Sequence, residues 1–423
     1  MNAIAAKLKK PSGLHPFING VLAYGSAEAF TRIVRLAAIL VVSRQVSPEM
    51  LGTAALALSI FELIRVFANV GIGQRIIVAG DDEVEAISQS AHRLFWIVCI
   101  AVCTLQLLAA ALTWTIWQAG EAAAMLAFLA AVYLFMPAGL VQIFRAMRLQ
   151  KMGATAQVAA VQNGADCVLT LILVLIWPSA WAIVLPKVLT APIWLILARR
   201  TFTWRADQAI AGAPYSAFRS FGPAILGSEL LGAARLHGDK LLIGAMLGTE
   251  ALGLYYFAFN AGLGIAQSFV AACNMVLFPH LAHQSSANLE REFRVSFFIG
   301  LAFLTPLVAG QALLAPCYVP IVFGEHWAAA APYLAILSCA ALPLYAGSLL
   351  GARHRASGNP YAETSLMAVG TVAALLGLVI GAKFSLADAC TGFGAGLAAV
   401  FLTAATMQLS RNSKKSSMFK GDI

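Results

Sequence analysis

Residues 94–117 read LFWIVCIAVCTLQLLAAALTWTIW, a run without a single charged side chain. An apolar helix of roughly 20 residues crosses the hydrocarbon core of a bilayer. Similar runs recur along the whole chain with short connectors, and they are continuous rather than alternating. Only helices and closed barrels satisfy the backbone inside lipid, and continuous runs favour helices. We therefore expect an all-α integral membrane protein.

The composition supports the bilayer as solvent. The 423 residues are 60% hydrophobic and 11% charged, whereas soluble domains carry about 25% charged residues. The net charge of +9 is spread over short loops rather than gathered on one face, which excludes a nucleic-acid partner. Most of the seven cysteines fall inside apolar runs without metal or disulfide spacing. We expect no cofactor and no metal.

Twelve membrane helices are predicted, six on each side of the polar connector 199–219. Their ranges are 17–43, 51–73, 93–117, 121–144, 159–177, 180–198, 223–247, 252–277, 293–315, 328–351, 364–382 and 386–409. Residues 1–210 would form an N-terminal lobe of helices 1–6, residues 211–410 a C-terminal lobe of helices 7–12, and residues 411–423 a disordered basic tail.

The loop charges predict the orientation. With the N-terminus in the cytoplasm, every Lys and Arg outside the membrane except Arg44 and Lys383 lies on the cytoplasmic side, as the positive-inside rule requires. No small-residue cleavage site follows the basic N-terminus, so we expect an anchoring first helix rather than a signal peptide. The prediction is a multi-pass protein of a bacterial inner membrane with both termini cytoplasmic.

The two halves resemble one another when the sequence is shifted by 201 positions. The identities include Glu49 with Glu250, Leu51 with Leu252 and Gly52 with Gly253, so Glu-x-Leu-Gly falls at the same helix junction in both halves. Copies of six helices share their orientation, and parallel repeats of this kind place substrate between the halves near the midplane.

Eleven charged residues fall within the predicted helices. They are Glu28, Arg32, Arg35, Glu62, Arg65, Asp166, Lys187, Glu229, Arg235, Asp239 and Lys240. A charge at the bilayer centre costs at least ~2.5–3.5 kcal/mol, so these residues should face protein or a hydrated cavity.

Six of these residues are cations, and they are the substrate-binding candidates: Arg32, Arg35, Arg65, Lys187, Arg235 and Lys240. Because carboxylates can protonate in a low dielectric and Arg cannot, the cavity should be cationic and suit a phosphate or pyrophosphate. The structural alternative is a set of ion pairs, for which Glu28–Arg32, Glu62–Arg65 and Arg235–Asp239 have suitable spacing. Arg35, Lys187 and Lys240 lack a partner within their own helix, which favours a functional role.

The five acids are candidates for proton or sodium coupling, since buried carboxylates can titrate near neutral pH. They are Glu28, Glu62, Asp166, Glu229 and Asp239.

Four segments resemble the bacterial polysaccharide flippases of the multidrug/oligosaccharidyl-lipid/polysaccharide (MOP) exporter superfamily. They are residues 43–52 (SRQVSPEMLG), 237–244 (HGDKLLIG) with 250–255 (EALGLY), 278–281 (FPHL) and 323–327 (FGEHW). The resemblance implies two six-helix lobes, alternating access, and an undecaprenyl-pyrophosphate-linked oligosaccharide as cargo for exopolysaccharide, capsule or O-antigen synthesis. It places Arg32, Arg35, Arg235 and Lys240 among the pyrophosphate-binding positions. Membrane lipids, a polysaccharide polymerase and export machinery are the partners it suggests.

Other functions remain as alternatives. An ion-coupled exporter of drugs or cations would share the fold but should have an acidic, aromatic cavity. A membrane polymerase or ligase should carry catalytic residues on a large external loop, and the longest external connector, 316–327, is short. A scaffold would not need so many intramembrane charges. We therefore expect a transporter rather than an enzyme.

Overall fold

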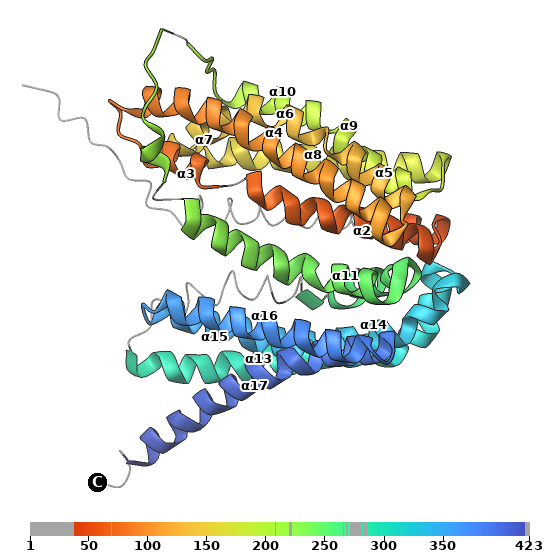
Figure 1. Ribbon diagram of the computed structural model, residues 1–423. Helices are drawn as coiled ribbons and strands as arrows, with labels where there is room; N and C mark the ends of the chain where they lie inside the picture. Colours follow the sequence, from red (N-terminus) through yellow and green to blue (C-terminus); the bar gives the residue numbers. More distant parts are fainter. Residues whose placement is uncertain are drawn as a thin grey trace, which may run out of the picture.

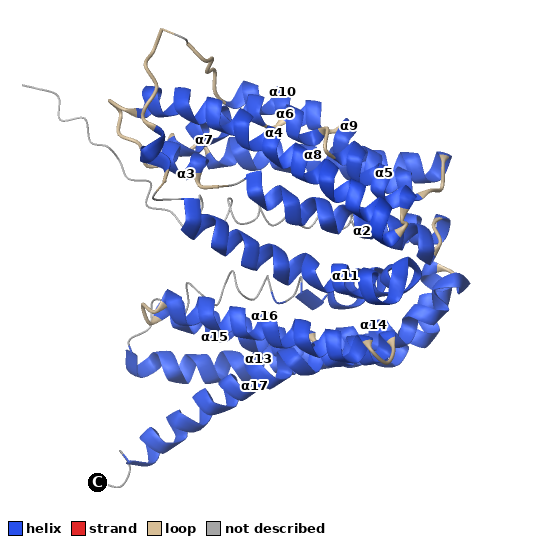
Figure 2. Ribbon diagram, in the orientation of Figure 1, coloured by secondary structure: helices blue, strands red, loops and turns tan. Residues whose placement is uncertain are grey.

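The computed structural model describes residues 38–418 except 69, 208, 220–221, 265, 268–269, 271–280 and 282–285. The described residues form helices and connecting segments without strands (Figure 2). The N-terminal lobe contains α2 (Pro48–Arg65), α3 (Ile72–Ile77), α4 (Val84–Trp117), α5 (Gly120–Leu129), α6 (Val132–Phe135), α7 (Pro137–Arg148), α8 (Met152–Ile176), α9 (Ala180–Leu189) and α10 (Ala191–Thr201). The C-terminal lobe contains α11 (Gly222–Ala258), a π-helical turn at Phe259–Leu263, α13 (Ser286–Phe323), α14 (Ala331–Cys339), α15 (Ala341–Ala356), α16 (Pro360–Ala382) and α17 (Leu386–Met418).

Several of these helices are segments of one membrane span. The span over α5, α6 and α7 bends by 53° at Met136, where Pro137 cannot donate its backbone nitrogen to the helical ladder. α11 joins two spans at Gly248, whose φ of +87° lies in the left-handed region that glycine adopts without strain. The chain therefore reverses direction at Gly248 almost without a loop.

The described residues contain nine helices long and apolar enough to cross a membrane, or ten with the bent span. Gly248 divides Ile225–Leu263 into one complete span and the beginning of a second. The predicted first helix falls largely outside the described residues, which begin at residue 38. The prediction of an all-α membrane protein is confirmed.

Several predicted boundaries were wrong. α4 begins at Val84 rather than at residue 93, and α13 runs from Ser286 to Phe323 rather than over 293–315. The predicted external loop 316–327 is therefore mostly helix, followed by Gly324 and a 3₁₀ turn at Glu325–Ala330. The tail is not irregular from residue 411, because α17 continues to Met418. Hydropathy detects only the part of a helix that lies in lipid, so polar helix ends are missed.

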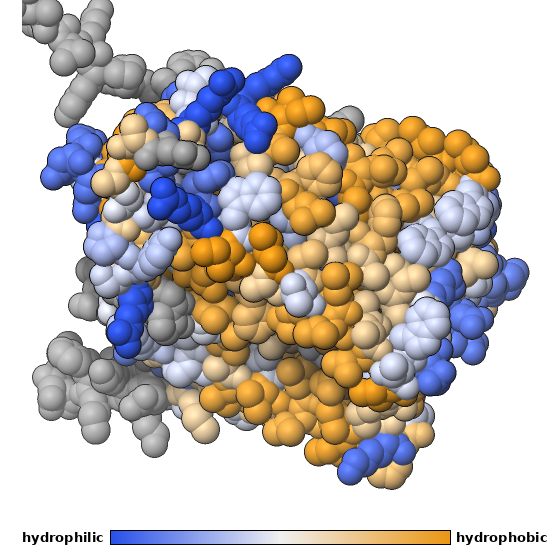
Figure 3. Space-filling view, turned by 45° about the horizontal axis from the view of Figure 1, so that its top comes forward, coloured by the Kyte–Doolittle hydropathy of each residue, from blue (hydrophilic) through white to orange (hydrophobic). Residues whose placement is uncertain are grey.

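The two lobes approach each other at one end and diverge toward the other (Figure 1). We call the end that carries the segments 78–83, 149–151, 202–219 and 357–359 the basic end, and the other the closed end. An apolar band lies between hydrophilic residues at both ends (Figure 3). Helix α8 contributes to the lipid-facing surface, since almost none of its most apolar window is buried. The lobes meet mainly through α2 and α11, which pack along each other.

A hydrogen-bonded turn orders the first segment of the basic end. The Gly80 amide donates to Glu83 Oε1 over 3.0 Å, and Arg75 Nη2 lies 2.9 Å from Glu83 Oε2. Both contacts lower the pKa of the Glu83 carboxyl below its usual value, and the Gly80 amide has a larger effect than the Arg75 guanidinium.

Candidate functional site

A cavity of about 320 Å³ lies between the lobes near the closed end. This volume is at the lower limit of small-molecule sites, which span about 300–1,000 Å³. The N-terminal lobe contributes Ile183 of α9, Leu51 of α2 and residues 38–43, and the C-terminal lobe contributes Tyr256, Phe257 and Asn260. Its lining is apolar apart from a few hydroxyl and amide groups. The predicted substrate-binding cations that the structure describes therefore lie outside this cavity.

Hydrogen bonds of Arg44, His326 and Trp327 join the lobes at the closed end. Arg44 donates to the carbonyl oxygens of Val322 (2.9 Å) and Ile321 (3.1 Å), which lie in the last turn of α13. Trp327 Nε1 donates to the Ser43 carbonyl oxygen over 2.6 Å, and His326 Nε2 lies 2.7 Å from the same oxygen. The last carbonyls of a helix lack partners within the helix and carry partial negative charge. Each lobe therefore caps the C-terminus of a helix in the other lobe.

The repeated Glu-x-Leu-Gly motif forms a reciprocal contact beside these bonds. A Cβ atom placed on Gly52 would lie 1.7 Å from the Thr249 carbonyl oxygen, and one on Gly253 would lie 1.7 Å from the Pro48 carbonyl oxygen. These pairs are related by the same shift of 201 positions that relates the two halves. Only glycine allows this backbone approach. The contact is therefore symmetric between the halves, as the predicted repeat requires.

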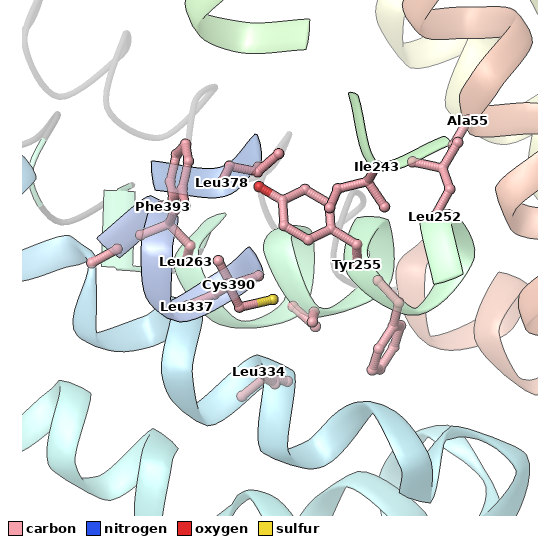
Figure 4. Packing of buried hydrophobic residues seen from close by; sticks show 14 of the residues in the cluster. Ala55, Ile243, Leu252, Tyr255, Leu263, Leu334, Leu337, Leu378, Cys390 and Phe393 are labelled. Carbon is pink, nitrogen blue, oxygen red and sulfur yellow. The ribbon is translucent and has the colours of Figure 1, made fainter. Parts of the chain in front are cut away.

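Side chains from α2 and α11 interlock behind the glycines. Ala55 of α2 points toward Ile243 and Leu252 of α11 (Figure 4). All three are buried. The closed end is therefore sealed by apolar packing as well as by hydrogen bonds.

The predicted pair Glu62–Arg65 is confirmed. Arg65 Nη2 lies 2.6 Å from Glu62 Oε2, and the Arg65 side chain remains 50% exposed. His237 of α11 interacts electrostatically with both members of this pair and with Asp239 and Lys240. The charged groups of α2 and α11 therefore lie within electrostatic range of one another.

Lys187 pairs with an acid on a neighbouring helix, which the spacing of charges within its own helix could not predict. Its Nζ atom lies 2.8 Å from Asp166 Oδ2, which joins α9 to α8. The side chains are 34% and 19% exposed, and Asp166 Oδ1 is buried with no hydrogen-bond partner among the described residues. Ile183 precedes Lys187 by four residues and lines the inter-lobe cavity, so the two share a helical face.

Lys240 pairs with its neighbour Asp239 in the interior of the C-terminal lobe. Its Nζ atom lies 3.1 Å from Asp239 Oδ1, 2.7 Å from the Leu236 carbonyl oxygen and 3.9 Å from the centre of the Phe259 ring. Tyr255 donates its hydroxyl to Asp239 Oδ2 over 2.8 Å. The Lys240 and Asp239 side chains are 6% and 0% exposed. Lys240 is therefore inaccessible to a ligand while this cluster remains closed.

The predicted pair Arg235–Asp239 was wrong, because Lys240 and Tyr255 occupy the Asp239 carboxylate. Arg235 is exposed and donates to Met367 Sδ over 3.8 Å. It forms no ion pair with any described residue. Among the predicted cations with described structure, Arg235 alone has no acidic partner in the described part of the chain, since Arg65, Lys187 and Lys240 are all paired.

Three predicted site residues, Glu28, Arg32 and Arg35, lie outside the described residues. Glu229 of α11 is described and exposed. The described cations Arg65, Lys187, Arg235 and Lys240 balance the acids Glu62, Asp166, Glu229 and Asp239 in number. The predicted cationic character therefore depends on Arg32 and Arg35.

The sequence analysis missed the residues that join the lobes. Arg44 was assigned only as a loop cation, although its position directly after an apolar run could have suggested a helix-capping role. The partners of Ser43 and Arg44 lie more than 270 positions away in the chain. The spacing of residues along one helix gives no information about such contacts.

Comparison with known proteins adds the family and the fold. Residues 41–332, more than half of the chain, match the family described as polysaccharide biosynthesis protein. The succinoglycan biosynthesis transport protein ExoT of Rhizobium meliloti is 22% identical over 70% of this chain and 60% of its own length. The lipopolysaccharide biosynthesis protein WzxC of Escherichia coli is 23% identical over 74% of this chain and 64% of its own. The teichuronic acid biosynthesis protein TuaB of Bacillus subtilis is 32% identical over 29% of this chain and 26% of its own. The chain thus matches less than two thirds of the length of each.

Solved structures share the fold at low identity. The lipid II flippase MurJ in an inward closed conformation gives a TM-score of 0.74 at 11% identity, over 93% of this chain and 87% of that one. A multidrug resistance MATE transporter of the MOP superfamily gives 0.66 at 18% identity in its inward-facing conformation, over 92% and 96%. Its outward-facing conformation gives 0.51 at 14%, over 93% and 94%. The chain therefore has the twelve-helix fold of these transporters.

Proposed function

The chain belongs to the polysaccharide biosynthesis protein family, and from that premise we propose that it is a flippase for undecaprenyl-pyrophosphate-linked oligosaccharide repeat units. The relative ExoT is named as a transport protein, and the structural neighbours are a multidrug transporter and a lipid II flippase. The observation that carries the proposal is the boundary between the lobes, which is joined at the closed end and lined with charged residues nearer the basic end. The substrate would enter from the basic end.

In this proposal the basic end faces the cytoplasm of a bacterial inner membrane. The positive-inside rule supports this orientation, since the loops at that end carry almost all of the extramembrane Lys and Arg. The closed end would then face outward, and the chain would be in an inward-facing state. The higher TM-score to the inward-facing than to the outward-facing MATE structure agrees with this assignment.

The charged residues would hold the pyrophosphate by exchanging partners. Arg235 has no acidic partner among the described residues and Arg65 is half exposed, so both can bind an anion without breaking a buried cluster. Lys187 would become available when a coupling cation replaced it at the Asp166 carboxylate. Arg32 and Arg35 would complete the cationic surface. Lys240 would join only in a rearranged state.

The same exchange would couple transport to an ion gradient. Asp166 has one oxygen without a partner among the described residues and Glu62 is paired with a half-exposed cation, so these acids can bind a proton or sodium. Glu28, Glu229 and Asp239 remain further candidates. A transport rate that does not depend on proton or sodium gradients would contradict coupling but leave the flippase assignment intact.

Complementation of a flippase-null strain tests the proposal. Wild-type protein should restore surface polysaccharide, whereas Arg65→Ala and Arg235→Ala should reduce it by tenfold or more at equal membrane expression. Lys383→Ala is the matched control, because Lys383 is an exposed cation at the closed end and outside the inter-lobe boundary. If the wild type restores nothing in its own host background, the exporter of drugs or cations becomes the better assignment.

A further inference from the structure

A second and larger cavity, of about 700 Å³, lies at the basic end within the N-terminal lobe. His92 of α4, Gln142 of α7 and Arg199 of α10 line it, together with Trp204 and Arg205 of the segment after α10. It shares no lining residue with the inter-lobe cavity. The proposed transport path gives it no role.

The cavity is positively charged. Arg199 donates its Nε–H to the Ala138 carbonyl oxygen over 3.2 Å, which positions the guanidinium. No carboxylate of the described residues pairs with Arg199 or Arg205. The nearby acid Glu85 accepts from Trp204 Nε1 over 2.6 Å and pairs with Arg145 at 3.1 Å. Its charge is therefore already compensated, and two guanidinium groups remain available for a phosphate.

Gln142 leaves a hydrogen-bond acceptor in the cavity wall. Its Nε2 donates to the Trp204 carbonyl oxygen over 3.1 Å, which fixes the orientation of the amide. The residue is only 6% exposed, and its Oε1 has no donor among the described residues. A buried acceptor without a donor costs free energy. Gln142 Oε1 has almost no accessible surface, so a ligand hydroxyl would reach it, and be stabilised by it, only after the amide turns into the cavity.

Apolar side chains stand one helical turn from the cavity, toward the membrane. Ile196 precedes Arg199 by three positions, so it lies on the helical face of a lining residue. Ile97 of α4 and Leu134 of α6 lie within five positions of the lining residues His92 and Ala138. Ile196, Ile97 and Leu134 are 53%, 58% and 54% exposed. A ligand with acyl chains would cover these residues while its head group entered the cavity.

We propose that this cavity binds a glycerophospholipid whose head group carries hydroxyl groups, such as phosphatidylglycerol. Arg199 and Arg205 bind the phosphodiester, a head-group hydroxyl donates to Gln142 Oε1, and the acyl chains lie on Ile97, Leu134 and Ile196. An ammonium head group fits less well, because it would stand beside two guanidinium groups. This inference does not depend on the transported substrate.

Lipid titration of the purified full-length protein, followed by native mass spectrometry, tests the proposal. Phosphatidylglycerol should bind about tenfold more tightly to the wild type than to Arg199→Ala or Arg205→Ala, as expected for loss of a charge-assisted hydrogen bond. Arg200→Ala is the matched control, because Arg200 is the exposed neighbour of Arg199 and does not line the cavity. Equal affinity in all four proteins would overturn the proposal.

Two further ligands identify the chemistry without any substitution. Phosphatidylcholine has the same phosphodiester but no head-group donor, so it should bind several-fold more weakly than phosphatidylglycerol. Equal binding of the two lipids would overturn the role of Gln142. Inorganic phosphate should not displace the lipid at millimolar concentration, and efficient displacement would show a small-anion site rather than a lipid site.

Discussion

The two lobes each contain a Lys–Asp pair, and the pairs differ in burial. Lys187–Asp166 in the N-terminal lobe joins two helices, is partly exposed and leaves one carboxylate oxygen without a partner among the described residues. Lys240–Asp239 in the C-terminal lobe is almost fully buried and is further bound by Tyr255. Burial makes a pair costly to break, whereas a partly exposed pair exchanges partners more easily. A Lys–Asp pair is therefore suited to stability in the C-terminal lobe and to ligand exchange in the N-terminal lobe.

The largest effect on stability is expected for Lys240→Met. The substitution leaves Asp239 as an unpaired buried charge, which costs about 3–5 kcal/mol in the free energy of unfolding. Thermal unfolding of the purified protein in detergent measures it. The double variant Asp239→Asn/Lys240→Met removes both charges and should recover part of the loss. A single variant as stable as wild type would contradict the structural role of this pair.

Tyr255→Phe should have an intermediate effect. It removes the hydroxyl that donates to Asp239 while keeping the buried ring, so it loses one hydrogen bond to a charged group, worth about 1.5–3 kcal/mol. The same unfolding measurement applies. Tyr318→Phe is the matched control, since Tyr318 is a half-buried tyrosine of α13 whose hydroxyl bonds to no described residue, and its stability should change less than that of Tyr255→Phe.

A smaller effect on stability than that of Lys240→Met is expected for Lys187→Met, because the Asp166 carboxylate that loses its partner is partly exposed. Surface polysaccharide in the complementation assay should nevertheless fall, because the substitution removes a cation that the pyrophosphate would use. Comparison with Lys240→Met therefore separates a role in stability from a role in binding the pyrophosphate. A large loss of stability with Lys187→Met would show that the exposed pair is structural as well.

The pairs also show what helical spacing predicts. Glu62–Arg65 was found from the sequence because both residues lie on one helix three positions apart. The same rule failed for Arg235–Asp239, since it could not foresee that Tyr255, from the next span, would bind the carboxylate. Lys187–Asp166 was missed because its members belong to different helices, 21 positions apart. Local spacing identifies candidate pairs but does not decide between competing partners.

The sequence alone determined the membrane class, the helical fold, the approximate spans and the repeat. Each follows from local hydropathy or from the internal similarity of the chain, and neither requires knowledge of how the helices pack. The tertiary structure alone decided which charges neutralise one another and how Ser43 and Arg44 join the lobes. These contacts depend on distances between helices far apart in the chain, since Coulomb and hydrogen-bond energies are set by separation in space.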